Sequence, residues 1–144
     1  MDKTKFTLKD GGQDKHFVIK KMGALQAANW SLGLASLGFN AFGRKDLDWN
    51  SDAIMTALSQ VDSPKAGELR KQLRESVSVV TGVGEFQLDD LMLEQHIQEF
   101  QNVFLIEAEA FKANFGFFIV GGGLKSLVSS LMSAVRPDST PPSS

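Results

Sequence analysis

The sequence predicts an α+β fold, a single and mostly α-helical domain with a β-hairpin at its N-terminus. Two observations predict it. Apolar and polar residues alternate on both sides of a glycine-containing turn near the N-terminus, and apolar residues then recur at helical intervals through most of the chain. A chain of 144 residues fits one domain, and a domain of this size buries about two-thirds of the surface that it exposes when unfolded.

The predicted hairpin lies within residues 6–20. Phe6 and Leu8 alternate with polar residues before the turn, and Phe17 and Ile19 do so after it. The turn between them contains two consecutive glycines, which adopt the positive φ of a tight turn without steric cost. A two-stranded ribbon is only marginally stable alone. We therefore expect the face that carries these four apolar residues to pack on the helices, and the lysines of the other face to be solvated.

Three helices are predicted before residue 77. The first ends at Gly38, the second is a short helix capped by Asn50 or Ser51, and the third is capped by Ser63 with Pro64 at its first position. The segment between the first two, residues 39–48, is interpreted as a loop. Residues 77–84 lose the helical period and gain β-branched residues and glycines. We interpret them as a loop that contains at most a short strand.

The longest predicted helix begins after a cap at Asp89 or Asp90. It runs to Asn114, either unbroken or with a bend near Gln101 and Asn102. Its apolar side is expected to consist of Leu91, Leu93, Ile97, Phe100, Val103 or Phe104, Ala108 and Phe111.

A different kind of segment follows three consecutive glycines at 121–123, which we interpret as a hinge. The apolar residues after it recur at i, i+3, i+4, i+7, i+8 and i+11 and predict an amphipathic helix: Leu124, Leu127, Val128, Leu131, Met132 and Val135. Residues 137–144 are rich in Pro and Ser and are expected to be disordered. The predicted organisation is therefore a domain over 1–120, a glycine-hinged amphipathic helix over 121–136, and a tail over 137–144.

Composition argues against several classes of function. The net charge is −2 and both signs are mixed along the chain, which is not the basic stripe of a nucleic-acid-binding protein. The chain has no Cys and two His, and no spacing assembles a catalytic group or a metal site. We therefore expect no enzyme, no cofactor and no metal. Residues 115–135 carry one charge but contain three consecutive glycines and four serines, which argues against a membrane-spanning helix.

The function is therefore expected to depend on contacts with other proteins. The candidate partner-binding residues surround the glycine hinge: Phe115, Phe117, Phe118, Ile119, Val120, Leu124, Leu127, Val128, Leu131 and Met132. The alternatives are that these residues pack on their own domain, as an aromatic run at the end of a helix usually does, or lie on a lipid surface.

Three segments resemble the tail assembly chaperones of long-tailed, siphovirus-like bacteriophages. They are the strands at 6–9 (FTLK) and 17–22 (FVIKKM) that lead into a Trp-bearing helix, the segment 58–65 (LSQVDSPK) with the leucine rhythm that follows it to residue 77, and the segment 111–118 (FKANFGFF). The resemblance covers about residues 5–120.

The resemblance implies an α-rich fold with a small β-element, a homo-oligomer, and binding to the tape-measure protein. That binding would occur in the host cytoplasm before the tail tube polymerises, and the chaperone would be absent from the finished virion. Two alternatives stay open. One is a structural protein of the virion, for head–tail completion or associated with the tail tube, and the other is a small membrane-associated adaptor.

Overall fold

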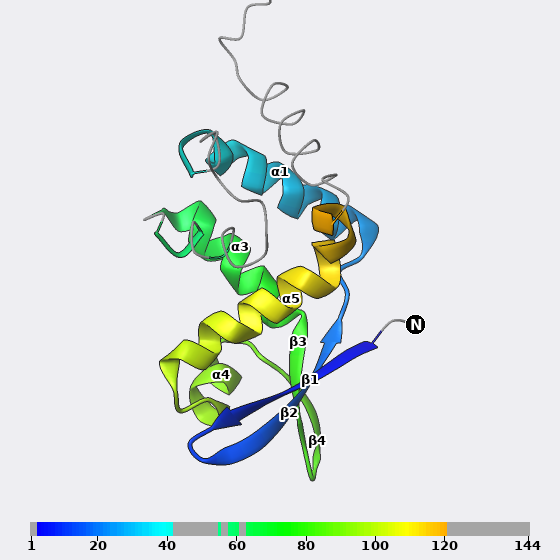
Figure 1. Ribbon diagram of the computed structural model, residues 1–144, viewed down its shortest axis with the longest axis vertical. Coiled ribbons are helices and arrows are strands. Elements are labelled where there is room, and N and C mark those ends of the chain that lie inside the picture. Colours follow the sequence, from blue (N-terminus) through cyan, green and yellow to red (C-terminus); the bar gives the residue numbers. More distant parts are fainter. Residues whose placement is uncertain (1–2, 42–54, 56–57, 61–62, 121–144) are drawn as a thin grey trace, which may run out of the picture.

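The computed structural model describes residues 3–41, 55, 58–60 and 63–120, and it places a β-sheet at one end of the molecule and most of the helices at the other (Figure 1). The elements in chain order are β1 (Lys3–Asp10), β2 (Gln13–Lys20), α1 (Ala24–Ala41), α3 (Pro64–Glu75), β3 (Val77–Thr81), β4 (Gly84–Gln87), α4 (Asp90–His96) and α5 (Phe100–Val120). Residues 39–41 of the predicted loop at 39–48 belong to α1, and its remainder lies outside the described residues. The cap of the second helix, the glycine hinge, the amphipathic helix and the tail also lie outside them. The domain boundaries that depend on them remain predictions.

The N-terminal hairpin is present in the structure. β1 pairs with β2 in antiparallel register, and Phe6 lies opposite Phe17. Gly11 and Gly12 connect the strands with φ of 60° and 81°. Positive φ at both central residues is the requirement of a type I′ turn, whose twist matches that of the flanking strands.

The predicted fold class is wrong in its β content. The hairpin is not the main β-element beside helices, because residues 77–87 form two further strands and extend it into a four-stranded antiparallel sheet of order β1-β2-β3-β4. Residues 77–81 alternate between the faces of the sheet, with Val77 and Val79 buried and Val80 exposed. The free edge of β2 supplies the hydrogen-bonding partners for these residues, so tertiary pairing decided a segment whose local pattern was ambiguous.

One face of this sheet carries a row of apolar side chains that crosses all four strands. The pairing aligns Phe6, Phe17, Val79 and Phe86. The rings of Phe6 and Phe17 stack with their centroids 5.0 Å apart. Phe17 and Val79 are buried, while Phe6 and Phe86 are partly buried against the same core. This row is the surface on which the helices pack.

Trp30 joins three helices above the sheet. Its ring stacks on that of Phe115 at 4.9 Å and lies 5.7 Å from that of Phe111, so that α1 packs on α5. Its indole N–H donates a hydrogen bond of 2.9 Å to the carbonyl oxygen of Leu69 in α3. Gly33 lets α1 approach α3 closely, since a Cβ at this position would lie 2.9 Å from a methyl carbon of Leu69.

The helix boundaries confirm some predictions and correct others. Ser63 caps α3 with Pro64 in its first turn, and its hydroxyl accepts a hydrogen bond from the amide of Ala66. Asp89 caps α4 in the same way. However, α1 does not stop at Gly38 but continues to Ala41, and the predicted long helix is two helices, separated at residues 97–99 rather than bent at 101–102.

A buried carboxylate explains the position of this break. Asp10, at the end of β1, accepts hydrogen bonds of 2.9 Å from the amides of Gln98 and Glu99 and from the side chain of Asn102. Lys15 forms an ion pair with it at 2.7 Å and also donates to the carbonyl oxygen of His96. This group, the Asp10 clamp, holds the hairpin turn against the start of α5 and occupies amides that a continuous helix would use internally.

The electrostatics of the clamp favour the ionised carboxylate. Burial alone would raise the pKa of Asp10, but the ion pair with Lys15 and the three hydrogen bonds hold the pKa well below its usual range. The clamp therefore contributes stability that is fully present above the unfolded-state pKa, near 3.8, and that is lost as the pH falls toward the folded-state value.

Replacing Asp10 with Asn tests the clamp. We expect Asp10→Asn to lower the free energy of unfolding at pH 7 by about 2–3 kcal/mol, because it removes hydrogen bonds to a charged group and the partner of Lys15. The deficit relative to the natural sequence should shrink as the pH is lowered from 4 toward 2. Denaturant unfolding at several pH values measures both. Asp14→Asn, at an exposed position of the same hairpin, is the control and should change the free energy by less than about 0.5 kcal/mol. A deficit that is the same at all pH values would contradict this account.

Candidate protein-binding surface

The structure separates the predicted partner-binding residues into two groups. Phe115 is buried in the domain core against Trp30. Phe117, Phe118, Ile119 and Val120 belong to the last turns of α5, but their side chains lie outside the described part of the structure. Leu124, Leu127, Val128, Leu131 and Met132 also lie outside it. A contact role for these residues therefore remains a prediction.

The described part of the chain instead exposes large apolar side chains at the opposite end of α5. Phe100 is 76% exposed, Phe104 41% and Leu105 47%. We call these three residues the α5 surface. Leu91, in the first turn of α4, is also exposed. A cluster of exposed large apolar residues, unlike a single one, is a feature that marks interaction sites.

Leu91 and Phe100 were predicted on the apolar side of one helix, which is wrong because both are exposed. Of the alternatives Val103 and Phe104, it is Val103 that packs against the core, while Phe104 is exposed. That prediction extended the helical phase of the first turns through Ile97, where the chain leaves the helix. After the break, α5 has a different rotation about its own axis, and the side that faces the core carries Ile106, Ala110 and Phe111. One signal was available: residues 103–106 are four consecutive apolar residues, and a single face of a helix cannot hold all four.

A buried ionic triad lies beside the α5 surface and links α5 to α3. Glu107 is fully buried and accepts hydrogen bonds from the guanidinium of Arg70 at 2.8 and 3.1 Å and from that of Arg74 at 2.7 Å. The two arginines are four residues apart and therefore share one face of α3. No structural role was predicted for Glu107 from the sequence. Its position three residues after Phe104, within an apolar helix, was the signal for a buried partner.

The triad also supports the exposed aromatic side chain. The guanidinium carbon of Arg70 lies 5.1 Å from the ring centroid of Phe104, in a cation–π contact. Arg74 also forms an ion pair with Asp90 at 3.3 Å. This ion pair connects the start of α4, where Leu91 lies, to the ionic triad. Because Glu107 holds the guanidinium of Arg70, the ring of Phe104 packs on a group that is itself fixed in place. Aromatic residues next to arginine are typical of the residues that carry most of the binding energy of protein interfaces.

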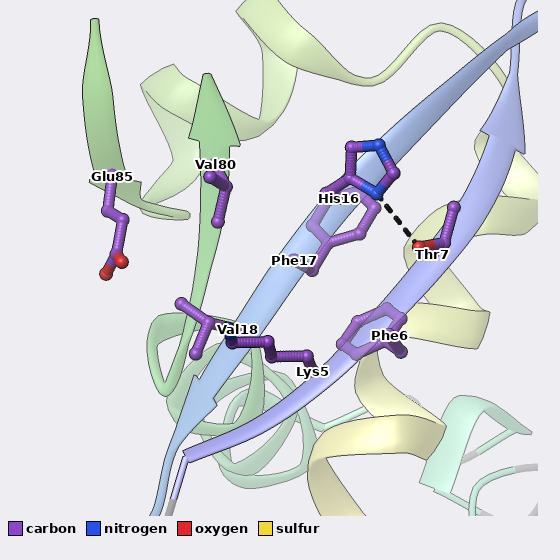
Figure 2. Close-up of a pocket in the computed structure, with 8 residues that line it drawn as sticks. All are labelled: Lys5, Phe6, Thr7, His16, Phe17, Val18, Val80 and Glu85. Atoms are coloured by element: carbon purple, nitrogen blue, oxygen red, sulfur yellow. Dashed lines mark hydrogen bonds between the residues drawn. The ribbon is translucent and has the colours of Figure 1, made fainter. Parts of the chain in front are cut away.

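A shallow hollow of about 310 Å³ lies on the outer face of the sheet (Figure 2). Its lining comes from β1, β2, β3 and β4: Lys5, Phe6, Thr7, His16, Phe17, Val18, Val80 and Glu85. The ring of His16 is turned toward the hydroxyl of Thr7, 2.9 Å away. Glu85 lies on β4, separated from His16 by β3, so the only carboxylate and the only imidazole of the lining do not form an acid–base pair. The hollow therefore lacks the convergent polar groups of a ligand site.

Other kinds of site were sought in the same residues. In the described ranges, no three His, Cys, Asp or Glu side chains gather closely enough to hold a metal ion. None of the helices seen in these ranges has the length and apolar character needed to cross a membrane. The α5 surface is thus the strongest candidate site in the described structure.

Comparison with known families bears on this surface. A family model for the phage tail assembly chaperone protein matches residues 11–125, which is most of the chain. The chain belongs to the phage tail assembly chaperone family. The resemblance noted in its sequence is thereby confirmed. No curated protein and no solved structure matches it significantly.

The range of the family match includes some of the candidate contact residues of this tail assembly chaperone and leaves others outside. The α5 surface, Leu91 and the ionic triad all lie inside the matched range. Most of the predicted C-terminal stripe lies beyond its end at residue 125, including Leu127, Val128, Leu131 and Met132. The stripe after residue 125 is therefore a feature of this chain that the family model does not describe.

Replacing Glu107 with Gln tests the support of the α5 surface. It leaves two largely buried arginines without their common counter-charge, and we expect the free energy of unfolding to fall by about 3 kcal/mol or more. Glu109→Gln is the matched control, because its ion pair with Lys112 is solvent-exposed and should contribute less than about 1 kcal/mol. Denaturant unfolding measures both variants. Equal stability of Glu107→Gln and Glu109→Gln would show that the triad does not fix α3 against α5.

Proposed function

We propose that this tail assembly chaperone binds the tape-measure protein and keeps it soluble until the tail tube polymerises around it. Membership of the family supports a role in tail assembly. The observation that supports binding to an apolar client is the α5 surface, where Phe100, Phe104 and Leu105 are exposed on a helix that is held by a buried ionic triad.

The physical argument concerns the client. A tape-measure protein is a long and largely helical chain, and apolar stripes along it would aggregate if they stayed exposed. A helix with such a stripe binds by laying apolar side chains at i, i+3, i+4 and i+7 against an apolar surface of its partner. Phe100 and Phe104 are one helical turn apart on α5 and present two aromatic rings to such a stripe. Arg70, which contacts the ring of Phe104, is paired with Glu107, so binding there leaves no unpaired cation buried.

The remaining parts of the proposal concern the C-terminal region and the life of the complex. The apolar residues from Phe117 to Val120 and from Leu124 to Met132 form a second contact, either with the client or with another copy of the chaperone. The protein acts by binding and without catalytic chemistry. It works in the cytoplasm of the infected host and leaves the tail before the virion is complete.

Substitution of the two exposed phenylalanines tests the client contact. We expect the Phe100→Ser, Phe104→Ser double variant to lose soluble tape-measure protein on co-expression and to weaken its binding at least tenfold, which corresponds to about 1.4 kcal/mol. Co-purification and the soluble fraction of the tape-measure protein measure this.

Val83→Ser is the control, because Val83 is the most exposed large apolar residue in the described part of the chain and lies on the distant turn between β3 and β4. It should leave binding unchanged. Denaturant unfolding must show that the double variant is folded, since Phe104 also contacts Arg70. A folded double variant that keeps the tape-measure protein soluble as well as the natural sequence does would refute the contact. Stoichiometric chaperone in purified virions would refute its release.

A further inference from the structure

The outer face of α1 is unusual for an exposed helix because it carries no charge. None of the 18 residues of α1 is Asp, Glu, Lys or Arg. Five of its exposed positions follow one helical stripe at i, i+3, i+4, i+7 and i+11, which we call the α1 outer face: Leu25, Ala28, Asn29, Leu32 and Ser36. Leu25 is 76% exposed and Leu32 42%. A helix on the surface of a protein normally carries charged residues on the side opposite its buried stripe. This face is therefore better suited to packing against another uncharged surface than to contact with solvent.

The end of α5 lies beside this helix. Phe115 stacks on Trp30 of α1, and the amide of Met22, just before α1, donates a hydrogen bond of 2.8 Å to the side chain of Asn114. Val120 follows Phe115 by five residues, about 7.5 Å along a helix axis. Figure 1 shows the last turns of α5 next to α1. The chain therefore leaves the described domain beside α1, about one helix diameter from its outer face.

The segment that follows has the length and the chemistry to cover that face. The stripe from Leu124 to Val135 spans eleven residue steps, as does the α1 outer face from Leu25 to Ser36. Each span is about 17 Å long in a helix. The three glycines between Val120 and Leu124 reach about 10 Å when extended, which is similar to the diameter of one helix. The segment contains one charge, that of Lys125, so packing the two uncharged faces together removes no carboxylate or ammonium from water.

We propose that the α1 outer face is the docking surface of the chain's own segment 124–135. The short tether keeps the segment at an effective concentration in the millimolar range, which favours this contact over the same contact with a second copy. Docking hides the C-terminal stripe together with Leu25 and Leu32. Release of the segment exposes the α1 outer face and the apolar stripe of segment 124–135 at the same time. The α1 outer face therefore competes with any partner that binds this stripe.

The absence of cysteine from the chain makes a direct test possible. Asn29 and Val128 lie near the middle of their stripes, so docking in either direction brings them close. We expect the full-length Asn29→Cys, Val128→Cys variant to form an intrachain disulfide under mild oxidation. In the control, Glu85→Cys, Val128→Cys, the first cysteine lies on β4 at the sheet end of the molecule (Figure 1). Its disulfide should form at least about tenfold more slowly if the segment is docked rather than free.

The outcomes separate the possible occupants. A third variant adds Leu131→Asp to the test pair and should slow the disulfide to the rate of the control, because docking would bury the new carboxylate. Equal rates of disulfide formation in the test and control pairs would overturn the proposal. It would also be overturned if Leu131→Asp did not slow disulfide formation in the test pair. A disulfide between two chains, seen as a covalent dimer at micromolar protein, would identify a second copy as the occupant and overturn docking within one chain. The tape-measure protein is absent from the experiment, so its result does not depend on the proposed function.

Discussion

The indole ring of Trp30 is the contact on which the helical layer depends. One face of the ring packs on Phe115 and Phe111 of α5, and its N–H is bonded to the carbonyl oxygen of Leu69 in α3. An aromatic residue of this size buries more apolar surface than any other type, and its one polar atom needs a partner when buried. Both requirements are met here by different helices. Trp30 therefore specifies the relative positions of α1, α3 and α5 rather than only filling the space between them.

Two buried carboxylates then determine which side of α5 faces solvent. Asp10 holds the first residues of the helix against the hairpin turn, and Glu107 holds the middle of the helix against the arginines of α3. A buried carboxylate that loses its partners costs several kcal/mol, so rotations of α5 that would separate either group are excluded. The rotation that satisfies both groups leaves Phe100 and Phe104 exposed. The candidate binding surface is thus a consequence of polar contacts made at the start and in the middle of the same helix.

Charge is distributed unevenly over the hairpin, the α5 surface and the α1 outer face, which suits each of them to a different kind of contact. Lysines line the outer face of the hairpin, which suits a sheet edge that must not pair with other chains. The α5 surface combines apolar residues with neutralised arginines, and the α1 outer face has no charge at all. The proposed function requires the protein to bind an apolar client and later release it, and weakly polar surfaces that can exchange partners fit that requirement. The proposed competition between α1 and a client for one stripe follows from the same division.

The sequence by itself determined the features that depend on neighbouring residues. The hairpin turn needed the positive φ of Gly11 and Gly12, Ser63 and Pro64 mark the start of α3, and Asp89 marks that of α4, because each acts on backbone groups within a few residues. The segments that resemble tail assembly chaperones also needed no structure. Residues 77–87 were different, since their local pattern suited a loop or a strand and only pairing with β2 decided between them.

The exposed surface could not be derived in the same way. The helical period of residues 91–111 predicted one continuous apolar side, but Asp10, almost ninety residues earlier in the chain, interrupts the helix at Gln98 and Glu99. Periodicity holds only while the helix is unbroken, so the helical phase was lost at that point, Phe100 was assigned to the core, and the choice between Val103 and Phe104 stayed open. Contacts between residues distant in the sequence set the rotation of α5. The tertiary structure therefore decided which of its aromatic residues meet solvent, and Phe115, which the sequence suggested for a partner, is held in the core by Trp30.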